Sequence, residues 1–367
     1  MALDRLTLSH FRNHAASRLE GSAKLNLLVG ENGAGKTNVL EALSLFAPGR
    51  GLRRAPLAEM AQAGGTGGFA ISAELDPEPV EGGVRREPVR LGIGVSPERP
   101  GRRVVHVNGA EANAAALAEW LAIGWLTPAM DGLFADSAAA RRRYMDRLAL
   151  ALDPAHARIA ARFEAALRER NRLLSAETAP DAHWLDAIEA QLAEAGAALA
   201  LGRARLVERL SVALADLPAS PFARPALAYA PGGPLDAQGL AAALARSRER
   251  DRAAQRTLIG PHRDELEVTL AGKAMPAAAS STGEQKAMLI AMTLVHADLA
   301  AAGRPALLLL DEVAAHLDPL RRAALFERLR AGGAQVWLTG TELAPFAEIE
   351  RAAAIWRVTN GAVERLS

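Results

Sequence analysis

Hydrophobic positions change their spacing twice along the chain. In roughly the first 110 residues, short apolar runs are separated by turn residues, a pattern typical of β-strands. Residues 3–8 alternate between apolar and polar, as in a half-buried strand, whereas residues 25–29 form a more continuous apolar run, as in a strand buried on both faces. Residues 136–215 carry almost no strand signal and resemble long helices. Strands alternate with helices again in roughly the last 110 residues.

This spacing predicts the individual elements. Further strands are expected at residues 69–75, 89–95, 104–107, 266–270, 307–310, 336–339 and 354–358. Helices are expected at residues 37–46, 183–217, 236–256, 282–302 and 319–330, and after the start signals Ser137 and Asp153-Pro154. The proline-rich stretch 218–234 indicates a linker or a short strand. The sequence therefore predicts an α/β head built from both chain ends, residues 1–135 and 251–367, with a mainly helical domain inserted at 136–250.

The composition narrows the function classes. The chain has 367 residues, half of them hydrophobic, which suffices for two or three packed lobes. Lys and Arg number 43 against 42 Asp and Glu, so any nucleic-acid surface must be a local patch. The absence of Cys excludes disulfides, thiolate zinc sites and Cys nucleophiles. Because the chain shows no signal-peptide pattern and no apolar run of membrane-spanning length, we expect a cytoplasmic protein with no membrane partner.

Residues 30–37, Gly-Glu-Asn-Gly-Ala-Gly-Lys-Thr, match the P-loop pattern G-x-x-x-x-G-K-[ST]. Gly33 and Gly35 allow the backbone to curve so that successive N–H groups face one anion. Lys36 is expected to reach the β- and γ-phosphates of a nucleotide, and the Thr37 hydroxyl to ligate Mg²⁺. An apolar strand precedes the loop and a helix follows it, as the motif requires. ATP with Mg²⁺ is therefore the predicted ligand.

Two adjacent acids, Asp311 and Glu312, end the apolar run at 306–310. Alone, two acids at a strand end are commonly just solvated. In a chain with a P-loop they favour a Walker B motif, in which Asp311 would hold Mg²⁺ and Glu312 would activate a water as general base.

Residues 280–286, Ser-Ser-Thr-Gly-Glu-Gln-Lys, open the helix expected at 282–302. A small polar turn at a helix N-terminus binds anions, and Ser281 with Glu284 would also form a capping box; both interpretations can hold. The order P-loop, this turn, Walker B and then Ala-His-Leu-Asp at 315–318 resembles ABC-type ATPases, with 315–318 as the D-loop. In that class the signature Ser of one subunit contacts ATP held by a second, so the resemblance implies an ATP-dependent homodimer.

Several blocks, spread in order along the chain, narrow this resemblance. They are residues 6–13 (Leu-Thr-Leu-Ser-His-Phe-Arg-Asn), 107–109 (Val-Asn-Gly), 125–128 (Trp-Leu-Thr-Pro), 141–146 (Arg-Arg-Arg-Tyr-Met-Asp) and 257–266 (Thr-Leu-Ile-Gly-Pro-His-Arg-Asp-Glu-Leu). With these blocks the chain resembles the RecF family of bacterial repair ATPases, which are related to SMC-type heads. The resemblance implies a slow ATPase whose ATP-engaged dimer clamps duplex DNA at gaps or single/double-strand junctions. It also implies that the protein works with RecR, and functionally RecO, to load RecA in gap repair, replication restart and the SOS response.

The motifs and the resemblance together define the candidate site. Lys36, Asp311 and Glu312 are the catalytic candidates, and Thr37 and Asp311 are the candidate metal ligands. Nucleotide contacts are expected from Arg12, Asn13, Gly30, Asn32, Gly33, Gly35, Lys36, Thr37, Asn38, Ser281, Gly283, Glu284 and Asp318.

The chain departs from the family pattern at a few positions. The signature carries Ser280 where Leu is usual and Glu284 where Gln is common, and Gly124-Trp125 stand where the family often has the Q-loop Gln. No His follows the strand at 336–339, where Thr339 or Thr341 could substitute for the switch His of transporters. An incomplete catalytic set of this kind fits slow hydrolysis.

Arginine clusters are the candidate DNA contacts. Residues 137–175 hold nine Arg against four acids, and phosphate contacts from such clusters position a duplex without reading its sequence. A solvated face laced with ion pairs is the alternative, above all at 246–252, and a lone His is more often structural. The candidates are Arg53, Arg54, Arg141, Arg142, Arg143, His262 and Arg263.

Two other functions stay open. The chain could be the ATPase head of a transporter or another SMC-like complex, although its helical insertion is longer than in transporter heads and lacks the heptads of a long coiled coil. It could also be a structural DNA-binding module that does not hydrolyse ATP. Glu312, a candidate base that such a module does not need, argues against the latter.

Overall fold

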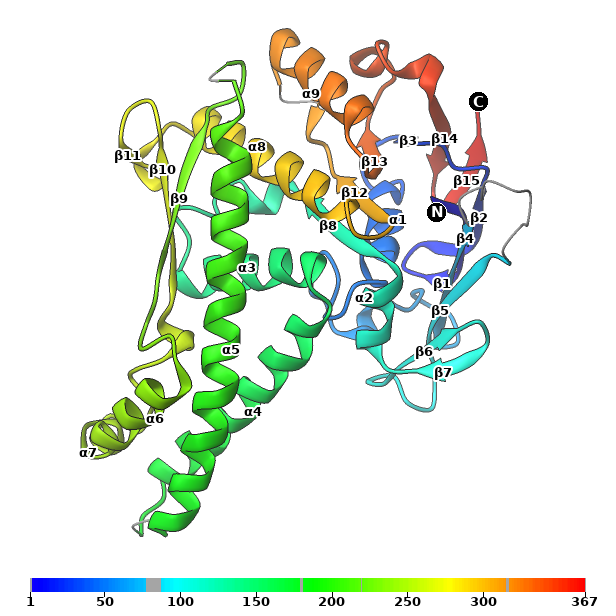
Figure 1. Cartoon of the computed structure of the whole chain (residues 1–367). Helices are drawn as coiled ribbons and strands as arrows, with labels where there is room; N and C mark the ends of the chain where they lie inside the picture. Colours follow the sequence, from blue (N-terminus) through cyan, green and yellow to red (C-terminus); the bar gives the residue numbers. More distant parts are fainter. Residues whose placement is uncertain (1, 77–86, 179–180, 219, 315–316, 367) are drawn as a thin grey trace. The chain divides into compact units, whose positions relative to one another are not determined.

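The structure, a computed structural model, describes residues 2–76, 87–178, 181–218, 220–314 and 317–366. The chain divides into two compact units, coloured by sequence in Figure 1. Unit 1 comprises Met1–Met130 and Thr293–Ser367, and unit 2 comprises Asp131–Met292. Unit 2 extends past the predicted boundary at residue 250, because the strands that follow it pack with its helices.

A mostly parallel sheet forms one layer of unit 1, with the strand order β15-β14-β3-β13-β12-β8. The five strands β14 to β8 pair in parallel, and β15 is antiparallel at the edge. Every residue of β3, β8, β12 and β13 is buried, which explains why their sequences are mostly apolar, with Asn26, Gln335 and Thr339 as buried polar exceptions. The strands are β3 (Leu25–Val29), β8 (Ala122–Leu126), β12 (Ala306–Leu310), β13 (Gln335–Gly340), β14 (Ala353–Thr359) and β15 (Ala362–Arg365).

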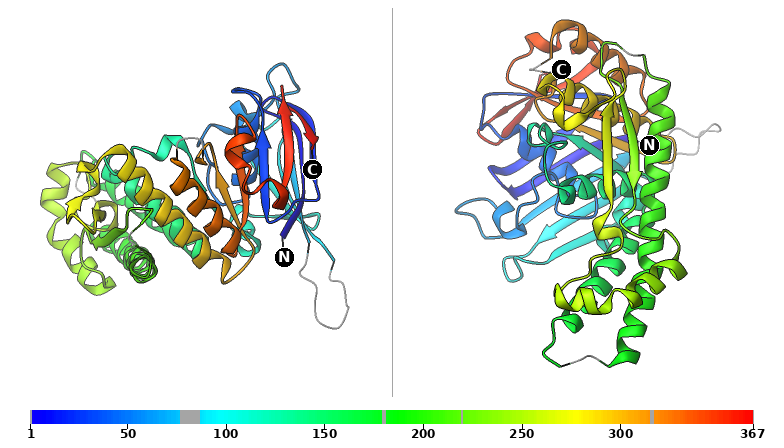
Figure 2. Two further views of the ribbon diagram at one scale, coloured as in Figure 1. Left: turned by 90° about the horizontal axis from the view of Figure 1, so that it is seen from above. Right: turned by 90° about the vertical axis from the view of Figure 1, so that its left-hand side faces the viewer.

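An antiparallel sheet with the order β2-β1-β4-β5-β6-β7 forms the second layer of unit 1 (Figure 2). Helix α1 (Lys36–Ser44) shares one hydrophobic core with both sheets, in which Leu6 of β1 and Leu40 of α1 join Trp337 of the parallel sheet. The strands are β1 (Ala2–Phe11), β2 (His14–Glu20), β4 (Phe69–Asp76), β5 (Val89–Val95), β6 (Arg103–Val107) and β7 (Ala110–Ala112). This packing fixes the helix that follows the P-loop.

Unit 2 combines long helices with a three-stranded sheet of order β11-β10-β9. Its helices are α3 (Ala138–Leu152), α4 (Ala155–Leu174), α5 (Ala182–Ala215), α6 (Ala237–Arg246) and α7 (Arg248–Ala253). Its strands are β9 (Pro225–Ala230), β10 (Glu265–Leu270) and β11 (Met275–Pro276). Phe163 of α4, Leu199 of α5 and Leu244 of α6 share a buried apolar cluster. Helix α8 (Thr282–Ala301) begins in unit 2 and ends in unit 1, which also holds α2 (Leu117–Trp120) and α9 (Pro319–Ala331).

The structure confirms most of the predicted elements and corrects one helix. The helix predicted at 236–256 is two helices, α6 and α7, separated at Ser247. The Ser247 hydroxyl donates to the carbonyl of Leu244 and to the carboxylate of Asp251, so its local bonds favour a break. Strands β2, β7, β11 and β15 were not predicted, because each is a short or half-exposed hairpin partner. The fully buried parallel strand β8 was not predicted either. Among the described residues, no helix has the length and apolar character needed to cross a bilayer.

Candidate nucleotide site and signature turn

The P-loop connects β3 to α1 and is held in a curved conformation. Gly33 and Gly35 have left-handed φ angles of 82° and 116°. A Cβ atom on Gly35 would lie 2.7 Å from Oδ1 of Asn13, so only glycine fits at this position. No side chain caps the N-terminus of α1, where Gly35 is the N-cap residue. The N–H groups at this helix start are therefore not capped by a side chain, which suits the anion site that the motif predicts.

Lys36 extends back along the loop. Its ammonium donates to the carbonyl oxygens of Gly30 at 2.5 Å and Glu31 at 2.8 Å, and only 4% of the residue is exposed. Burial lowers the pKa of Lys36, and the carboxylates of Glu312 and Asp311 partly offset this effect. The ammonium thus stands at a cavity of about 250 Å³. The lining residues are Asn32, Gly33, Gly35, Lys36, Thr37, Asn38, Arg53 and Glu312.

The two Walker B acids lie at the start of the P-loop helix, where Asp311 is bonded to Thr37 and Glu312 lines the cavity. The hydroxyls of Thr37 and Thr339 both donate to Oδ1 of Asp311, at 2.9 Å and 2.8 Å. The backbone N–H of Glu312 in turn donates to the Thr339 hydroxyl at 2.9 Å. Glu312 has a left-handed φ of 53°, which is unusual for a residue with a side chain and is typical of functional sites. The structure therefore brings the four polar side chains together at the ends of β12 and β13 and the start of α1.

The oxygen atoms of Thr37 and Asp311 fit a magnesium site. Mg²⁺ prefers hard oxygen ligands and is commonly bound through one or two protein groups plus phosphate and water. A hydroxyl and a carboxylate oxygen that lie 2.9 Å apart beside a P-loop provide such a pair.

Sequence reasoning gave Thr339 only as one of two possible substitutes for a switch His. The structure places Thr339 inside the acid cluster, whereas Thr341 is exposed and lines a different cavity. The signal for Thr339 is its position at the end of a parallel strand beside the Walker B strand.

The first hairpin braces the P-loop through side chains. Arg12 makes two hydrogen bonds of 2.8 Å to the carboxylate of the fully buried Glu41 on α1. Asn13 donates to the carbonyl of Ala34 at 2.9 Å and accepts a bond from Asn38 at 2.7 Å. Arg12 thus supports α1 from the side, and its expected contact with the nucleotide phosphates stays a prediction. Asn13 and Asn38 lie directly behind the loop.

Arg53 lines the cavity beside Lys36, and its predicted DNA contact stays a prediction. Its guanidinium donates to Oδ1 of Asn38 at 2.6 Å and to Glu41 at 3.0 Å. A cation at this position suits a nucleotide phosphate. Sequence alone could not separate the two roles, because the partners of Arg53 lie on α1. Arg54 is exposed, and its predicted DNA contact stays a prediction.

His14 is a buried residue that sequence reasoning missed. Its Nε2 lies 3.1 Å from the carbonyl oxygen of Gly35, and its Nδ1 lies 2.9 Å from the Ser17 hydroxyl. Burial lowers the pKa of His14, so the neutral imidazole is favoured. The only sequence signal was its position directly after the Phe-Arg-Asn block.

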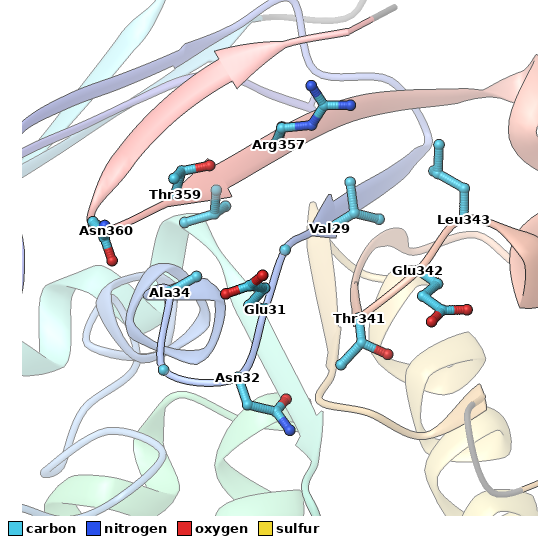
Figure 3. A pocket seen from close by; sticks show the side chains of 13 residues that line it. Val29, Glu31, Asn32, Ala34, Thr341, Glu342, Leu343, Arg357, Thr359 and Asn360 are labelled. Carbon is cyan, nitrogen blue, oxygen red and sulfur yellow. The ribbon is translucent and has the colours of Figure 1, made fainter.

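A larger cavity of about 680 Å³ adjoins the outer face of the P-loop (Figure 3). It shares Asn32 and Gly33 with the phosphate cavity beside Lys36, and its other lining residues come from the end of β3, the rest of the P-loop, the segment that follows β13, and the end of β14. Glu31 of the loop and Glu342 after β13 are exposed acids on its wall. The P-loop therefore separates the phosphate cavity from this larger one, whose wall carries Arg357 as well as the two acids.

The signature turn in unit 2 forms the predicted capping box. The Ser281 hydroxyl donates to Oε2 of Glu284 at 2.9 Å and accepts from the Glu284 N–H at 3.3 Å. The backbone N–H of Ser281 also donates to this carboxylate, at 3.0 Å. Lys273, in the turn after β10, lies with its ammonium 2.5 Å from Oε1 of Glu284. Lys273 and the bonds from Ser281 lower the pKa of Glu284 to about 2.

Gly283 is exposed in the first turn of α8, and its predicted nucleotide contact stays a prediction. Of the D-loop, Ala315 and His316 lie outside the described residues. Asp318 accepts from the N–H of Arg321 at 3.0 Å and so caps α9. This cap does not test its predicted role at the nucleotide.

Comparison with known proteins identifies the family. The family described as "RecF/RecN/SMC N terminal domain" matches residues 2–364. The "DNA replication and repair protein RecF" of Mesorhizobium japonicum is 46% identical over 98% of this chain and 97% of its own length. The chain belongs to the RecF family.

Solved structures show the same fold. A structure titled "Structure of the recombination mediator protein RecF-ATP in RecFOR pathway" superposes with a TM-score of 0.86 at 22% identity, covering 100% of this chain and 98% of that one. An Smc head domain from Pyrococcus furiosus, crystallised with the C-terminal domain of ScpA, gives a TM-score of 0.55 at 16% identity, with coverage of 100% and 96%. The predicted ABC-type α/β head of the RecF and SMC kind is therefore confirmed.

The two RecF-like blocks in unit 2, residues 141–146 and 257–266, form hydrogen bonds within this unit. Arg141 pairs with Glu265 through two bonds of 2.7 Å, and Arg142 donates to the carbonyl of Asp264 at 2.8 Å. His262 has Nε2 2.8 Å from the carbonyl oxygen of Thr257 and stacks on Phe163.

The buried carboxylate of Asp264 shows how tightly this block is held. It accepts bonds from Arg203, Tyr229 and the N–H of Gly232, at 2.8, 2.5 and 2.8 Å. Of the residues proposed for DNA in this unit, Arg143 and Arg263 are exposed. The DNA contacts of all five stay predictions.

Proposed function

We propose that this chain is an ATP-dependent DNA-binding protein of the RecF type. ATP binding drives two heads together, and the engaged dimer holds duplex DNA at gaps or single/double-strand junctions. The single observation that carries this proposal is the convergence of Lys36, Thr37 and Glu312 at one cavity, with Asp311 bonded to the Thr37 hydroxyl at 2.9 Å. Such a group serves nucleotide binding and hydrolysis together. A binding-only module would not need it.

Each residue of the cavity has a role in this proposal. The P-loop N–H groups and Lys36 bind the β- and γ-phosphates, as a concave cationic surface binds an anion. Thr37 and Asp311 would hold Mg²⁺, which supplies charge neutralisation when bound. Glu312 accepts the proton of the attacking water, and Thr339 holds the backbone of Glu312 in its left-handed conformation.

Hydrolysis is expected to be slow. β8 ends beside β12, where a Q-loop Gln would act, but this strand carries Gly124-Trp125 instead. One polar group that positions water is thereby replaced by a glycine and a largely buried indole. Slow hydrolysis leaves time for the ATP-bound clamp to stay on DNA, and hydrolysis then releases it.

The cellular role follows from family membership. We propose that the clamp works in the cytoplasm with RecR, and functionally with RecO, to help RecA load in gap repair, replication restart and the SOS response. A relative that matches over nearly the full length of both chains carries the name of a replication and repair protein, which favours this role over that of a transporter head.

The test is binding of a fluorescent gapped duplex, followed by anisotropy with ATP, with ADP and without nucleotide. Wild type and Glu312→Gln are expected to bind tightly only with ATP, and Lys36→Ala to bind weakly under all conditions. Equal affinity with and without ATP would contradict the proposal, because the nucleotide would then not control DNA binding.

A further inference from the structure

The signature turn, residues 280–286, contains the carboxylate of Glu284. The proposed function requires this same turn to bind the negatively charged phosphates of ATP. In the engaged dimer, Ser281 and the start of α8 would meet the phosphates of the ATP held by a second copy of the chain. Glu284 lies in the first turn of this helix, with Oε2 2.9 Å from the Ser281 hydroxyl. An uncompensated carboxylate at that distance would repel a polyphosphate.

Lys273 provides the missing positive charge. Its ammonium lies 2.5 Å from Oε1 of Glu284, while Oε2 accepts from Ser281. Lys286, the other lysine near the turn, pairs with Asp131 at 3.4 Å instead. The side chain of Glu284 is 22% exposed and that of Lys273 is 58% exposed, so the pair stands at the surface where a partner can approach.

The pair also determines how the serine is presented. The Ser281 hydroxyl both donates to the carboxylate and accepts from the N–H of Glu284, so its orientation depends on where the carboxylate stands. Lys273 and Ser281 hold the two oxygens of this carboxylate from different sides. Removing Lys273 would leave the carboxylate negative and held on one side only.

We propose that Lys273 is a positioning residue of the signature turn, which neutralises Glu284 and fixes it in the capping box so that the turn can accept the phosphates of ATP bound to a second copy. This inference rests on the proposed function. It explains how the chain uses Glu at the position where its family commonly has the neutral Gln. A lysine is needed only because the signature residue is acidic.

A surface ion pair of this kind contributes little to folding, so Lys273→Ala is expected to fold normally. Lys273→Ala should affect dimerisation more than folding, because the carboxylate of Glu284 would face a polyphosphate across the dimer interface. The effect is electrostatic, so added salt should reduce it.

The experiment measures ATP-driven dimerisation by light scattering over a range of protein concentrations, in a Glu312→Gln parent that retains ATP. Lys273→Ala is expected to raise the concentration for half-dimerisation on the order of tenfold. The same change in a Glu284→Gln background is expected to cost less than about twofold, because no carboxylate is left to neutralise. Lys24→Ala, which removes a lysine that bonds only the carbonyl of Gly332 among its described contacts, is the matched control and should change nothing.

The outcomes separate the inference from the function on which it rests. If the parent does not dimerise with ATP, the proposed function fails. If the parent dimerises and Lys273→Ala behaves like it, or if the loss is the same in both backgrounds, the role of Lys273 is wrong. Affinity for ATP in the monomer and the thermal unfolding midpoint should be unchanged in every variant, and a fall in either would assign Lys273 a structural role instead.

Discussion

The polar residues that form conspicuous sequence motifs are arranged differently in the two units. In unit 1, the P-loop and Walker B residues converge on an open cavity and bond one another at its wall. In unit 2, Arg141, Arg142 and Asp264 lie in equally conspicuous blocks, but their partners lie inside the unit. Arg141 bonds Glu265, Arg142 bonds the carbonyl of Asp264, and the carboxylate of Asp264 bonds Arg203. The residues of some short motifs serve to bind a ligand, whereas those of others stabilise the fold. Only the structure separates these two cases.

The largest expected effect tests the ligand-determined region. Glu312→Gln removes the proposed general base and should lower ATP turnover by about 10²–10⁴-fold, roughly 3–5 kcal/mol, with ATP binding retained. Steady-state phosphate release and a fluorescent ATP titration measure the two properties. Glu342→Gln changes an acid on the wall of the larger cavity. It is the control, and it should hydrolyse ATP at the wild-type rate. Unchanged turnover in Glu312→Gln would remove this residue from the mechanism.

The fold-determined region is tested by Arg170→Ala. The fully buried Arg170 bonds Glu189, Asp251 and Thr257, so its loss leaves buried carboxylates without a partner. We expect unit 2 to lose about 3–5 kcal/mol of unfolding free energy, measured by urea denaturation. Arg168→Ala, which breaks an exposed pair with Glu164, should change it by at most about 0.5 kcal/mol. Equal midpoints for the two variants would contradict the network.

Thr339→Val is a smaller change that tests whether the acid cluster depends on one hydroxyl. Valine keeps the shape of threonine but loses the bonds to Asp311 and to the N–H of Glu312, at a cost of about 1–3 kcal/mol. We expect a lower thermal midpoint and slower turnover together. The exposed Thr341→Val is the matched control, and similar behaviour of the two variants would show that the hydroxyl of Thr339 is dispensable.

The smallest expected effect distinguishes a surface role from an internal role among the three arginines at 141–143. If the exposed Arg143 contacts a DNA phosphate, Arg143→Ala should weaken binding by about 1 kcal/mol and lower the salt slope of affinity by about one. Arg141→Ala should instead lower stability, because it breaks the pair with Glu265. Salt titrations of duplex binding and denaturation curves distinguish these results. The reverse pattern would mean that the surface and internal roles are exchanged.

The features that could be predicted from the sequence are those that depend only on residues close together in the chain. The P-loop, the Walker B acids and the capping box of Ser281 and Glu284 are local patterns, and the structure contains each of them. Two buried parallel strands were equally clear, because β12 is apolar throughout and β3 is apolar except for Asn26, whereas the buried strand β8 was not predicted.

What the sequence could not predict depends on distant partners. The hydroxyl of Thr37 and the carboxylate of Asp311 are 274 residues apart in sequence, and their bond follows from the order of the strands. The pairing of Arg12 and Arg53 with Glu41 of α1 could not be predicted either, since local charge does not identify a partner. The break at Ser247 likewise follows from Asp251, which is anchored by Arg170 on another helix.

The central claim is that ATP joins two copies of this chain around DNA. The most direct test is the molar mass by light scattering of the Glu312→Gln variant, with and without ATP and with and without a short duplex. The account predicts that ATP doubles the mass and that the duplex elutes only with the doubled species. A mass that stays monomeric at saturating ATP, or a duplex that binds equally without nucleotide, would contradict it.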